Sequence, residues 1–261
     1  MSAKICVLAS GSKGNCTYIT DGVTRLMIDA GLSCRRTEQA LATVGVGLAE
    51  IDAILLTHEH IDHTYGLVAI ERKYGTTVLA NRPTAYSVDI KLTTNISRFC
   101  KDNFDTGFKC GTIYVTPFRT MHDAVCPVGY TLTVGGHRIS YVTDLGEVTE
   151  SVRQNVLGSE LVILESNHDV EMLATGSYPP DLQARIRGKN GHLSNEQSAM
   201  FAEELVKSGT KTFVLAHLSE ENNTPSLALK TIQSALAQDN LDEGVRWIVA
   251  SQGVPTEVIE L

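Results

Sequence analysis

The sequence predicts an α/β fold in which two β-sheets pack face to face and helices cover their outer sides. Three observations lead to this prediction. Short apolar runs of strand length, separated by glycines and polar turns, dominate the first half of the chain. After residue 147 strands alternate with helical segments. No linker, low-complexity tract or charge block divides the 261 residues, so we expect a single domain over residues 1–261.

The first group of strands lies before residue 147, and each is an apolar run that ends in a loop. The expected strands are KICVLAS, NCTYIT, VTRLMIDAG, DAILLTHEH, TTVLA, GTIYVTPF, VGYTLTV and HRISYVTD. Residues 34–45 interrupt this pattern with helical spacing and a closing glycine, which predicts a helix outside the first sheet.

The second group of elements alternates strand and helix. The expected strands are ELVILES, KTFVLAH, RWIVASQG and the final residues. Ser194 and Gln197 form a capping box at the start of one helix, and Gly209 supplies its stop. A second helix has Thr224 as its cap and Pro225 in its first turn. We expect these helices to cover the second sheet.

Composition is that of a globular protein, since 43% of the residues are hydrophobic and 20% are charged. These values exclude disordered, collagen-like and coiled-coil proteins. The net charge of −8 argues against a protein that holds nucleic acid by charge alone. It still allows one whose phosphate affinity comes from bound metal ions and one local basic patch.

The expected compartment is the cytoplasm. The six cysteines include no CxxC pair, which indicates reduced thiols. The segment KICVLAS at the N-terminus lacks the charged and long apolar regions of a secretory leader. No apolar run approaches the roughly 18 residues of a membrane helix, so we expect no membrane partner.

The motif THEHIDH at residues 57–63 follows the apolar run AILL directly. His58 and His60 are two residues apart in an extended segment, so their rings point the same way. Asp62 and His63 follow where the chain should turn into a helix. This spacing lets the first pair hold one cation and the second pair another. Imidazole and carboxylate ligands suit Zn²⁺, Mn²⁺ or Fe²⁺. The alternative, a polar loop without a metal, is disfavoured because these four candidate ligands lie within the six positions 58–63.

A two-metal site needs further ligands, and three more ligand-type residues follow apolar strands. His122 lies at the end of IYVTPFRTMHD, Asp144 ends SYVTD and His217 ends FVLAH. The same sheet edge could bring all three to one pocket. Any one of them alone would more often be a surface or core hydrogen-bonding residue, but the set of three predicts the rest of the site.

With these ligands in place, the sequence resembles the metallo-β-lactamase superfamily over nearly its whole length. The resemblance implies a four-layer αββα sandwich of two mixed sheets, with two divalent cations at one edge. It implies that the first cation is bound by His58, His60, His122 and Asp144. It implies that the second is bound by Asp62, His63, Asp144 and His217, with Asp144 bridging.

Within the superfamily the sequence is more similar to the YycJ group of bacterial members, also called WalJ or VicX. The similar segments are VLASGSKGNCTYI, MIDAGLS, THEHIDH, YVTDLG, LESNHD, GHLSNEQ and LAHLSEENN. This group is associated with 5′→3′ DNA exonuclease activity. The resemblance therefore implies DNA as the partner and a nuclease as the function.

The segments LVILESNHD and GHLSNEQSAMFAEEL are also similar to those of the transfer-RNA 3′ processing enzymes (tRNase Z) that supply a glutamate and a general-acid histidine. Here those residues are Glu165 and His192, although Leu193 departs from the tRNase Z pattern. A histidine oriented by a carboxylate can protonate a poor leaving group such as a departing alkoxide. A loop histidine or an extra metal ligand is the plainer interpretation of His192.

The leading hypothesis is a two-metal phosphodiesterase in which Asp62, Glu165 and His192 carry the catalysis. A hydroxide shared by the two cations would attack phosphorus, and His192 would protonate the leaving oxygen. An RNA-processing nuclease and a small-molecule hydrolase acting on a lactone, thioester or small phosphodiester are the alternatives within the superfamily. A non-catalytic metal-binding scaffold is disfavoured because the ligand set is complete.

Basic residues near His192 are candidates for substrate binding. Arg185, Arg187 and Lys189 could form a phosphate track, and a solvated charged loop is an equally good interpretation. Arg35 and Arg36 on the 34–45 helix could add to such a track.

Three further residues are expected near the metals without binding them. Asp29 in MIDAG is expected to orient the metal loop, and Asn15 in the glycine-rich SGSKGNC could support it. His168 is close enough to Glu165 in the sequence to be a minor pocket candidate.

Overall fold

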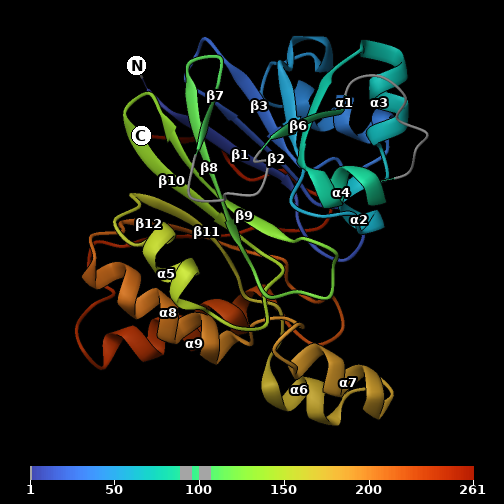
Figure 1. Cartoon of the computed structure of the whole chain (residues 1–261). Coiled ribbons are helices and arrows are strands. Elements are labelled where there is room, and N and C mark those ends of the chain that lie inside the picture. Colours follow the sequence, from blue (N-terminus) through green and yellow to red (C-terminus); the bar gives the residue numbers. More distant parts are fainter. Residues whose placement is uncertain (1, 89–95, 100–106) are drawn as a thin grey trace.

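The computed structural model describes residues 2–88, 96–99 and 107–261. Within these residues two seven-stranded sheets pack face to face, and helices lie on their outer sides (Figure 1). Each sheet is mixed, with antiparallel strands in one half and parallel strands in the other. The predicted sandwich of two mixed sheets with helices outside is confirmed, while the single domain over 1–261 stays a prediction.

The first sheet is built from the N-terminal half and closed by the last strand of the chain. Its strands, in spatial order, are β14 (Ile259–Glu260), β1 (Lys4–Ala9), β2 (Cys16–Thr20), β3 (Arg25–Ile28), β4 (Ala53–Leu55), β5 (Thr77–Asn81) and β6 (Ile96–Phe99). The elements beside it are α1 (Cys34–Ala42), the short 3₁₀ turn η1 (Leu48–Glu50), α2 (Ile61–Thr64), α3 (Leu67–Tyr74) and α4 (Arg82–Ser87).

The second sheet is built from the C-terminal half. Its strands, in spatial order, are β13 (Arg246–Val249), β12 (Thr212–Ala216), β11 (Leu161–Glu165), β10 (His137–Val142), β9 (Val128–Val134), β8 (Ile113–Arg119) and β7 (Phe108–Cys110). Its outer face is covered by α5 (Glu150–Val156), α8 (Asn195–Lys207) and α9 (Pro225–Ala237). Two further helices, α6 (Val170–Thr175) and α7 (Pro180–Arg187), lie at one end of the sandwich, at the lower right of Figure 1.

The strands are apolar on both faces because both faces are buried. In β1, Ile5 and Val7 belong to the core between the sheets, while Cys6 and Leu8 pack on the helices of the first sheet. Side chains alternate between the two faces of a strand, so a continuous apolar run fills both layers. This is why the strands read as uninterrupted hydrophobic segments in the sequence.

The capping signals are observed where the sequence predicts them. The Ser194 hydroxyl accepts from the Gln197 amide at 3.2 Å, and the Gln197 side chain accepts from the Ser194 amide at 2.9 Å. Thr224 caps α9 in the same way through the Leu227 amide at 3.2 Å. Local side-chain chemistry therefore determines where these two helices begin.

Two local expectations need correction. The helix expected after THEHIDH is interrupted between α2 and α3, where a Cβ on Gly66 would lie 2.0 Å from the Leu32 carbonyl oxygen. The Leu32 backbone therefore fills the space that a side chain at position 66 would need, and only glycine fits between α2 and α3. The strand expected to end at His122 ends at Arg119, so His122 lies in the following loop.

The structure also bears on the expectations about membrane helices and cysteines. Among the described residues, no helix combines the length and apolar character needed to cross a bilayer. The five cysteines in the described part of the chain are free thiols, and Cys100 lies outside the described residues.

Candidate metal centre

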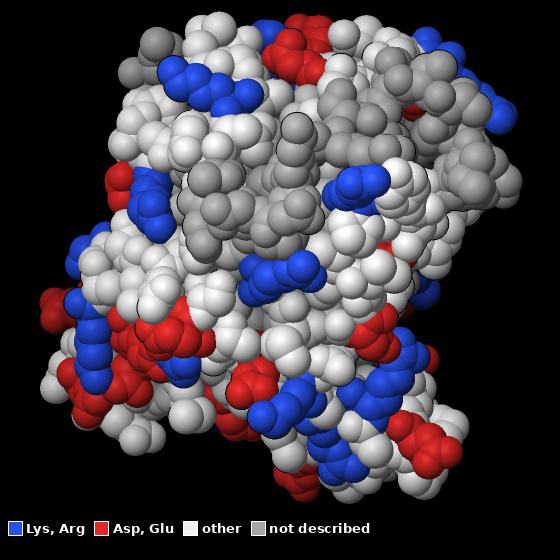
Figure 2. Space-filling model, viewed as in Figure 1, with Lys and Arg blue, Asp and Glu red and all other residues white. Residues whose placement is uncertain are grey.

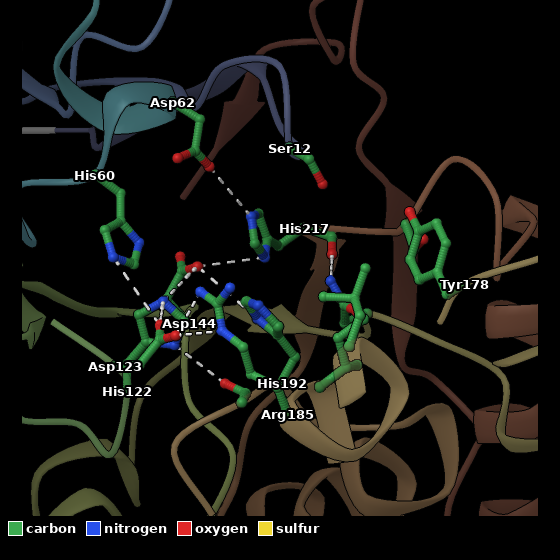
Figure 3. Close-up of a pocket in the computed structure, with 15 residues that line it drawn as sticks. Ser12, His60, Asp62, His122, Asp123, Asp144, Tyr178, Arg185, His192 and His217 are labelled. Carbon is green, nitrogen blue, oxygen red and sulfur yellow. Dashed lines mark hydrogen bonds and ion pairs between the residues drawn. The ribbon is translucent and has the colours of Figure 1, made fainter. Parts of the chain in front are cut away.

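The predicted ligands converge at one edge of the sandwich, although they come from distant segments. They lie after β4 (His58 and His60), on α2 (Asp62 and His63), after β8 (His122), after β10 (Asp144) and after β12 (His217). In Figure 3 the labelled histidines and aspartates of this set point toward a common centre. Strands β10, β11 and β12 run parallel, so the loops that follow them meet at the same edge.

The first cluster consists of His58, His60 and His122, whose ligand atoms lie within 4.8 Å of one another. The Thr57 hydroxyl donates to a carboxylate and can therefore accept from His58 Nδ1, which is 3.0 Å away. His122 Nδ1 donates to the Gly191 carbonyl at 3.1 Å. These bonds leave the Nε2 lone pairs of His58 and His122 for a cation.

The second cluster consists of Asp62, His63 and His217, whose ligand atoms also lie within 4.8 Å of one another. Asp62 Oδ2 is 3.3 Å from His63 Nε2 and 3.7 Å from His217 Nε2. Asp29 Oδ2 accepts from His63 Nδ1 at 2.7 Å, and Asn15 Nδ2 lies 3.2 Å from Asp62 Oδ2. Asp29 and Asn15 thus take the supporting positions that the sequence analysis expects for them.

Asp144 lies between the two clusters. Its Oδ2 is 3.4 Å from His63 Nε2, and its Oδ1 is 3.8 Å from His122 Nε2. The carboxylate is buried, and Oδ2 has no hydrogen-bond partner in the described part of the chain. This position is the one that a bridging ligand requires.

The donor set fits divalent cations. His58 Nε2 and His217 Nε2 are buried without a hydrogen-bond partner among the described residues, as is Asp144 Oδ2. Burial by itself lowers the pKa of His63, but the carboxylates of Asp29 and Asp144 raise it well above the usual value for histidine. Burial likewise lowers the pKa of His217, but the carboxylates of Asp144, Asp62 and Glu165 together outweigh burial and raise the pKa. Buried carboxylates that attract protons this strongly would also attract cations.

A buried glutamate links this centre to His192. Glu165 Oε1 accepts from His192 Nδ1 at 2.8 Å and from His217 Nδ1 at 2.8 Å. Its Oε2 accepts from the backbone amides of Leu145 and Leu193, each at 3.1 Å. Burial alone would raise the pKa of Glu165, but the two histidines lower it. Glu165 therefore remains a carboxylate that orients two histidines, whereas the sequence analysis assigned it to His192 alone.

Comparison with known proteins identifies the family. The profile of the β-lactamase superfamily domain matches residues 24–218. The chain belongs to the metallo-β-lactamase superfamily. It is 35% identical to exodeoxyribonuclease YycJ of Bacillus anthracis, over 94% of this chain and 93% of that protein. It is 37% identical to exodeoxyribonuclease WalJ of Streptococcus pneumoniae, over the same shares of both chains.

Solved structures of low sequence identity share the fold of this chain. The metallo-β-lactamase fold protein YhfI from Bacillus subtilis has a TM-score of 0.73 at 18% identity and covers 100% of both chains. The short form of human tRNase Z has a TM-score of 0.65 at 15% identity, covering 98% of this chain and 99% of that one. The predicted membership of the superfamily and the similarity to the YycJ group are confirmed, and the protein is a metal-dependent hydrolase.

Three residues of this candidate centre, two candidate ligands and one supporting residue, adopt a backbone conformation that is rare for residues with a side chain. Asp29, Asp144 and His217 have φ values of 61°, 58° and 57°. Among the described residues other than glycine, only Asn240 shares a positive φ. Each such residue costs about 1–3 kcal/mol and persists only where the surroundings enforce it. The sharp turn after a strand aims each side chain into the centre.

The pocket above the metal ligands has a volume of about 290 Å³. One wall is formed by the α7 segment through Tyr178, Leu182, Arg185 and Ile186. The sequence predicted Arg185 in this wall, but it did not predict Tyr178, Leu182 or Ile186, nor Asp123, which also lines the pocket beside His122. Leu182 and Ile186 are four residues apart on α7, and this helical spacing of apolar residues is the signal that could have revealed part of the wall.

The candidate basic residues are only partly brought to the pocket. Arg185 lines it, whereas Arg187 and Lys189 are absent from its described lining. Lys189 Nζ lies 3.2 Å from the Glu147 carboxylate. Several Lys and Arg side chains gather at the lower right of Figure 2, over the α6–α7 end of the molecule.

Three other residues considered from the sequence lie away from the pocket. Arg35 and Arg36 are on α1 beside the first sheet and do not line it within the described chain. His168 is buried near Glu165, and it too is absent from the described lining. The structure thus assigns no pocket position to these three residues.

Proposed function

We propose that this protein is a two-metal nuclease that hydrolyses DNA as a 5′→3′ exonuclease in the cytoplasm. The observation that carries the proposal is the position of His192, which lies in the wall of the metal pocket with its Nδ1 held by Glu165 at 2.8 Å. Phosphodiester hydrolysis needs a proton donor at this place, because the departing oxygen is a poor leaving group. The two curated relatives named exodeoxyribonucleases support the choice of DNA.

The proposed centre holds two divalent cations, with Mn²⁺ and Zn²⁺ as the first choices and Fe²⁺ as a third. The ligands of the first would be His58, His60, His122 and Asp144. The ligands of the second would be Asp62, His63, Asp144 and His217. When bound, the cations polarise the phosphate and lower the pKa of water toward about 7.

His192, Asp62 and Arg185 have further roles in the proposed reaction. Glu165 engages Nδ1 of His192, so Nε2 is the atom available to give a proton to the leaving oxygen. Such a proton transfer is worth about 10²–10⁴-fold in rate. Asp62 belongs to the catalytic set because its carboxylate lies between His63 and His217. Arg185 is the proposed phosphate contact in the pocket wall.

The size of the pocket supports attack at a chain end. Its volume of about 290 Å³ is at the lower limit of the roughly 300–1,000 Å³ typical of small-ligand clefts. A cleft of this size suits a single nucleotide at the end of a strand. The aromatic ring of Tyr178 on one side could stack on the base of that nucleotide.

The test uses duplexes labelled at either the 5′ or the 3′ end, with Mn²⁺ or Zn²⁺ added. A 5′→3′ exonuclease releases the 5′ label at once as a mononucleotide, while the 3′ label moves through a series of shortening strands. Asp62→Ala and His192→Ala are expected to remove this activity. No cleavage by the wild-type protein, or full cleavage by Asp62→Ala, would contradict the proposal. A matched RNA duplex measures the preference between DNA and RNA.

The small pocket also favours one alternative, a hydrolase of small phosphodiesters. The two functions differ in their need for a general acid, because p-nitrophenolate leaves without protonation. Under the nuclease proposal, His192→Ala loses activity on DNA and retains activity on bis-p-nitrophenyl phosphate. Equal losses on both substrates would contradict the acid role of His192.

A further inference from the structure

Asp123 connects the metal histidines to helix α7. Its Oδ2 accepts from Arg185 Nε at 2.6 Å and also pairs with Arg185 Nη2. Its Oδ1 lies 3.2 Å from His122 Nε2 and 3.9 Å from His60 Nε2. Asp123 and Arg185 lie side by side at the pocket in Figure 3. One carboxylate thus faces both the first cluster and the pocket wall.

Arg185 is the one Lys or Arg side chain among the described residues that line the pocket. The same lining contains the carboxylates of Asp62, Asp123 and Asp144. Among the described lining residues, a phosphate group that enters this pocket can therefore bind only one guanidinium, that of Arg185. A guanidinium offers five N–H donors in a fixed plane. Asp123 engages two of its nitrogens, and the side chain remains 63% exposed, so further donors face outward.

The backbone beneath Arg185 is held against the metal centre. The His192 amide donates to the Ile186 carbonyl at 2.9 Å, and the Gly191 carbonyl accepts from His122 Nδ1. A Cβ on Gly191 would lie 2.1 Å from the Ile186 oxygen, and one on Gly146 would lie 2.3 Å from the oxygen of Gly188. The end of α7 is therefore closely packed, and the flexible part of Arg185 is its side chain.

We propose that Asp123 is a positioning residue for substrate binding. It holds the Arg185 guanidinium at the rim of the metal pocket, where the guanidinium binds a phosphate next to the scissile one. This inference rests on the proposed nuclease function. An unrestrained arginine side chain loses conformational entropy when it binds a phosphate. The ion pair with Asp123 already orders the Arg185 side chain before substrate binds, so less entropy is lost on binding.

The test compares steady-state kinetics of the metal-loaded full-length protein on an oligonucleotide and on bis-p-nitrophenyl phosphate, which has no neighbouring phosphate. Asp123→Ala and Arg185→Ala are each expected to raise KM for the oligonucleotide about tenfold, with kcat within about twofold of wild type. The double variant is expected to match Arg185→Ala, because Asp123 acts only through that residue. Turnover of bis-p-nitrophenyl phosphate should fall by a clearly smaller factor than turnover of the oligonucleotide, and the metal content should not change.

The matched control removes another arginine–carboxylate pair. Arg153 Nε donates to Glu204 Oε2 at 2.8 Å, and neither residue lines the metal pocket. Glu204→Ala should therefore keep the wild-type KM for the oligonucleotide. A thermal unfolding curve for each variant shows that it is folded.

Three results would overturn the inference. KM effects of Asp123→Ala and Arg185→Ala that multiply in the double variant would show that the two residues act separately. A loss of metal in Asp123→Ala, or equal losses of turnover on the two substrates, would show that Asp123 serves the histidines instead. A wild-type KM in Asp123→Ala would show that the pairing does not matter. Failure of the wild-type protein to cleave any oligonucleotide is distinguishable, since it contradicts the nuclease function itself.

Discussion

Replacement of Glu165 by glutamine tests how far the centre depends on one buried carboxylate. Glu165 is fully buried and accepts four hydrogen bonds, two from His192 and His217 and two from the amides of Leu145 and Leu193. A carboxylate only accepts, whereas a glutamine side chain has one accepting oxygen and one donating NH₂ group. The glutamine NH₂ group would face either the two histidine N–H groups or the two backbone amides. In either orientation, two of the four donors would lose their acceptor.

The expected decrease in the free energy of unfolding follows from the loss of these two hydrogen bonds. A hydrogen bond to a charged group contributes about 1.5–3 kcal/mol, so Glu165→Gln should lower the free energy of unfolding by roughly 3–6 kcal/mol. The matched control is Glu160→Gln, because Glu160 Oε2 pairs with His137 Nδ1 at 2.9 Å on the surface. The Glu160 side chain is 49% exposed, so this variant should lose less than about 1 kcal/mol.

The assay is equilibrium unfolding in urea, followed by circular dichroism, with chelator present so that metal binding does not contribute. A free energy of unfolding for Glu165→Gln within about 1 kcal/mol of that for Glu160→Gln would refute the reasoning. It would mean that the four donors find other partners when the carboxylate is lost. On the metal-loaded protein, Glu165→Gln should also lower kcat by about 10²-fold or more, because His192 loses its orientation.

Three further predictions concern the support of the centre. Asp29→Asn should weaken metal binding at the second cluster by about 10–100-fold, because Asp29 fixes the tautomer of His63; a competition titration that finds the wild-type affinity would contradict this. Gly31→Ala should prevent stable folding or cost at least about 3 kcal/mol, since its Cβ would lie 1.6 Å from the Asp62 carbonyl oxygen. Gly253→Ala is the control, with nothing within 4 Å of the added carbon and an expected change within about 0.5 kcal/mol in the same urea assay. Chelation should abolish hydrolysis and lower the melting temperature, and Mn²⁺ or Zn²⁺ should restore both; a melting temperature that does not respond to the cations would argue against a metal centre in this pocket.

The sequence alone was enough to predict most strands of both sheets, two of the helix starts and the candidate ligands, but not β6 or β7. These features depend on residues that are close along the chain. The apolar run in KICVLAS, the cap at Ser194 and the spacing of His58 and His60 each follow from the geometry of one element. Ligand-type residues after strands could be grouped because parallel strands deliver their ends to one edge.

Only the tertiary structure decided which of these residues meet and through which atoms. Glu165 and His217 are 52 residues apart, and Asp123 and Arg185 are 62 apart, so neither contact leaves a local pattern. The same holds for the left-handed backbone at Asp144, which is strained and persists only because the surrounding loops enforce it. Periodicity and capping are determined by neighbours in the chain, whereas these contacts are determined by the order of strands in the sheets and by the packing of α7 at their edge.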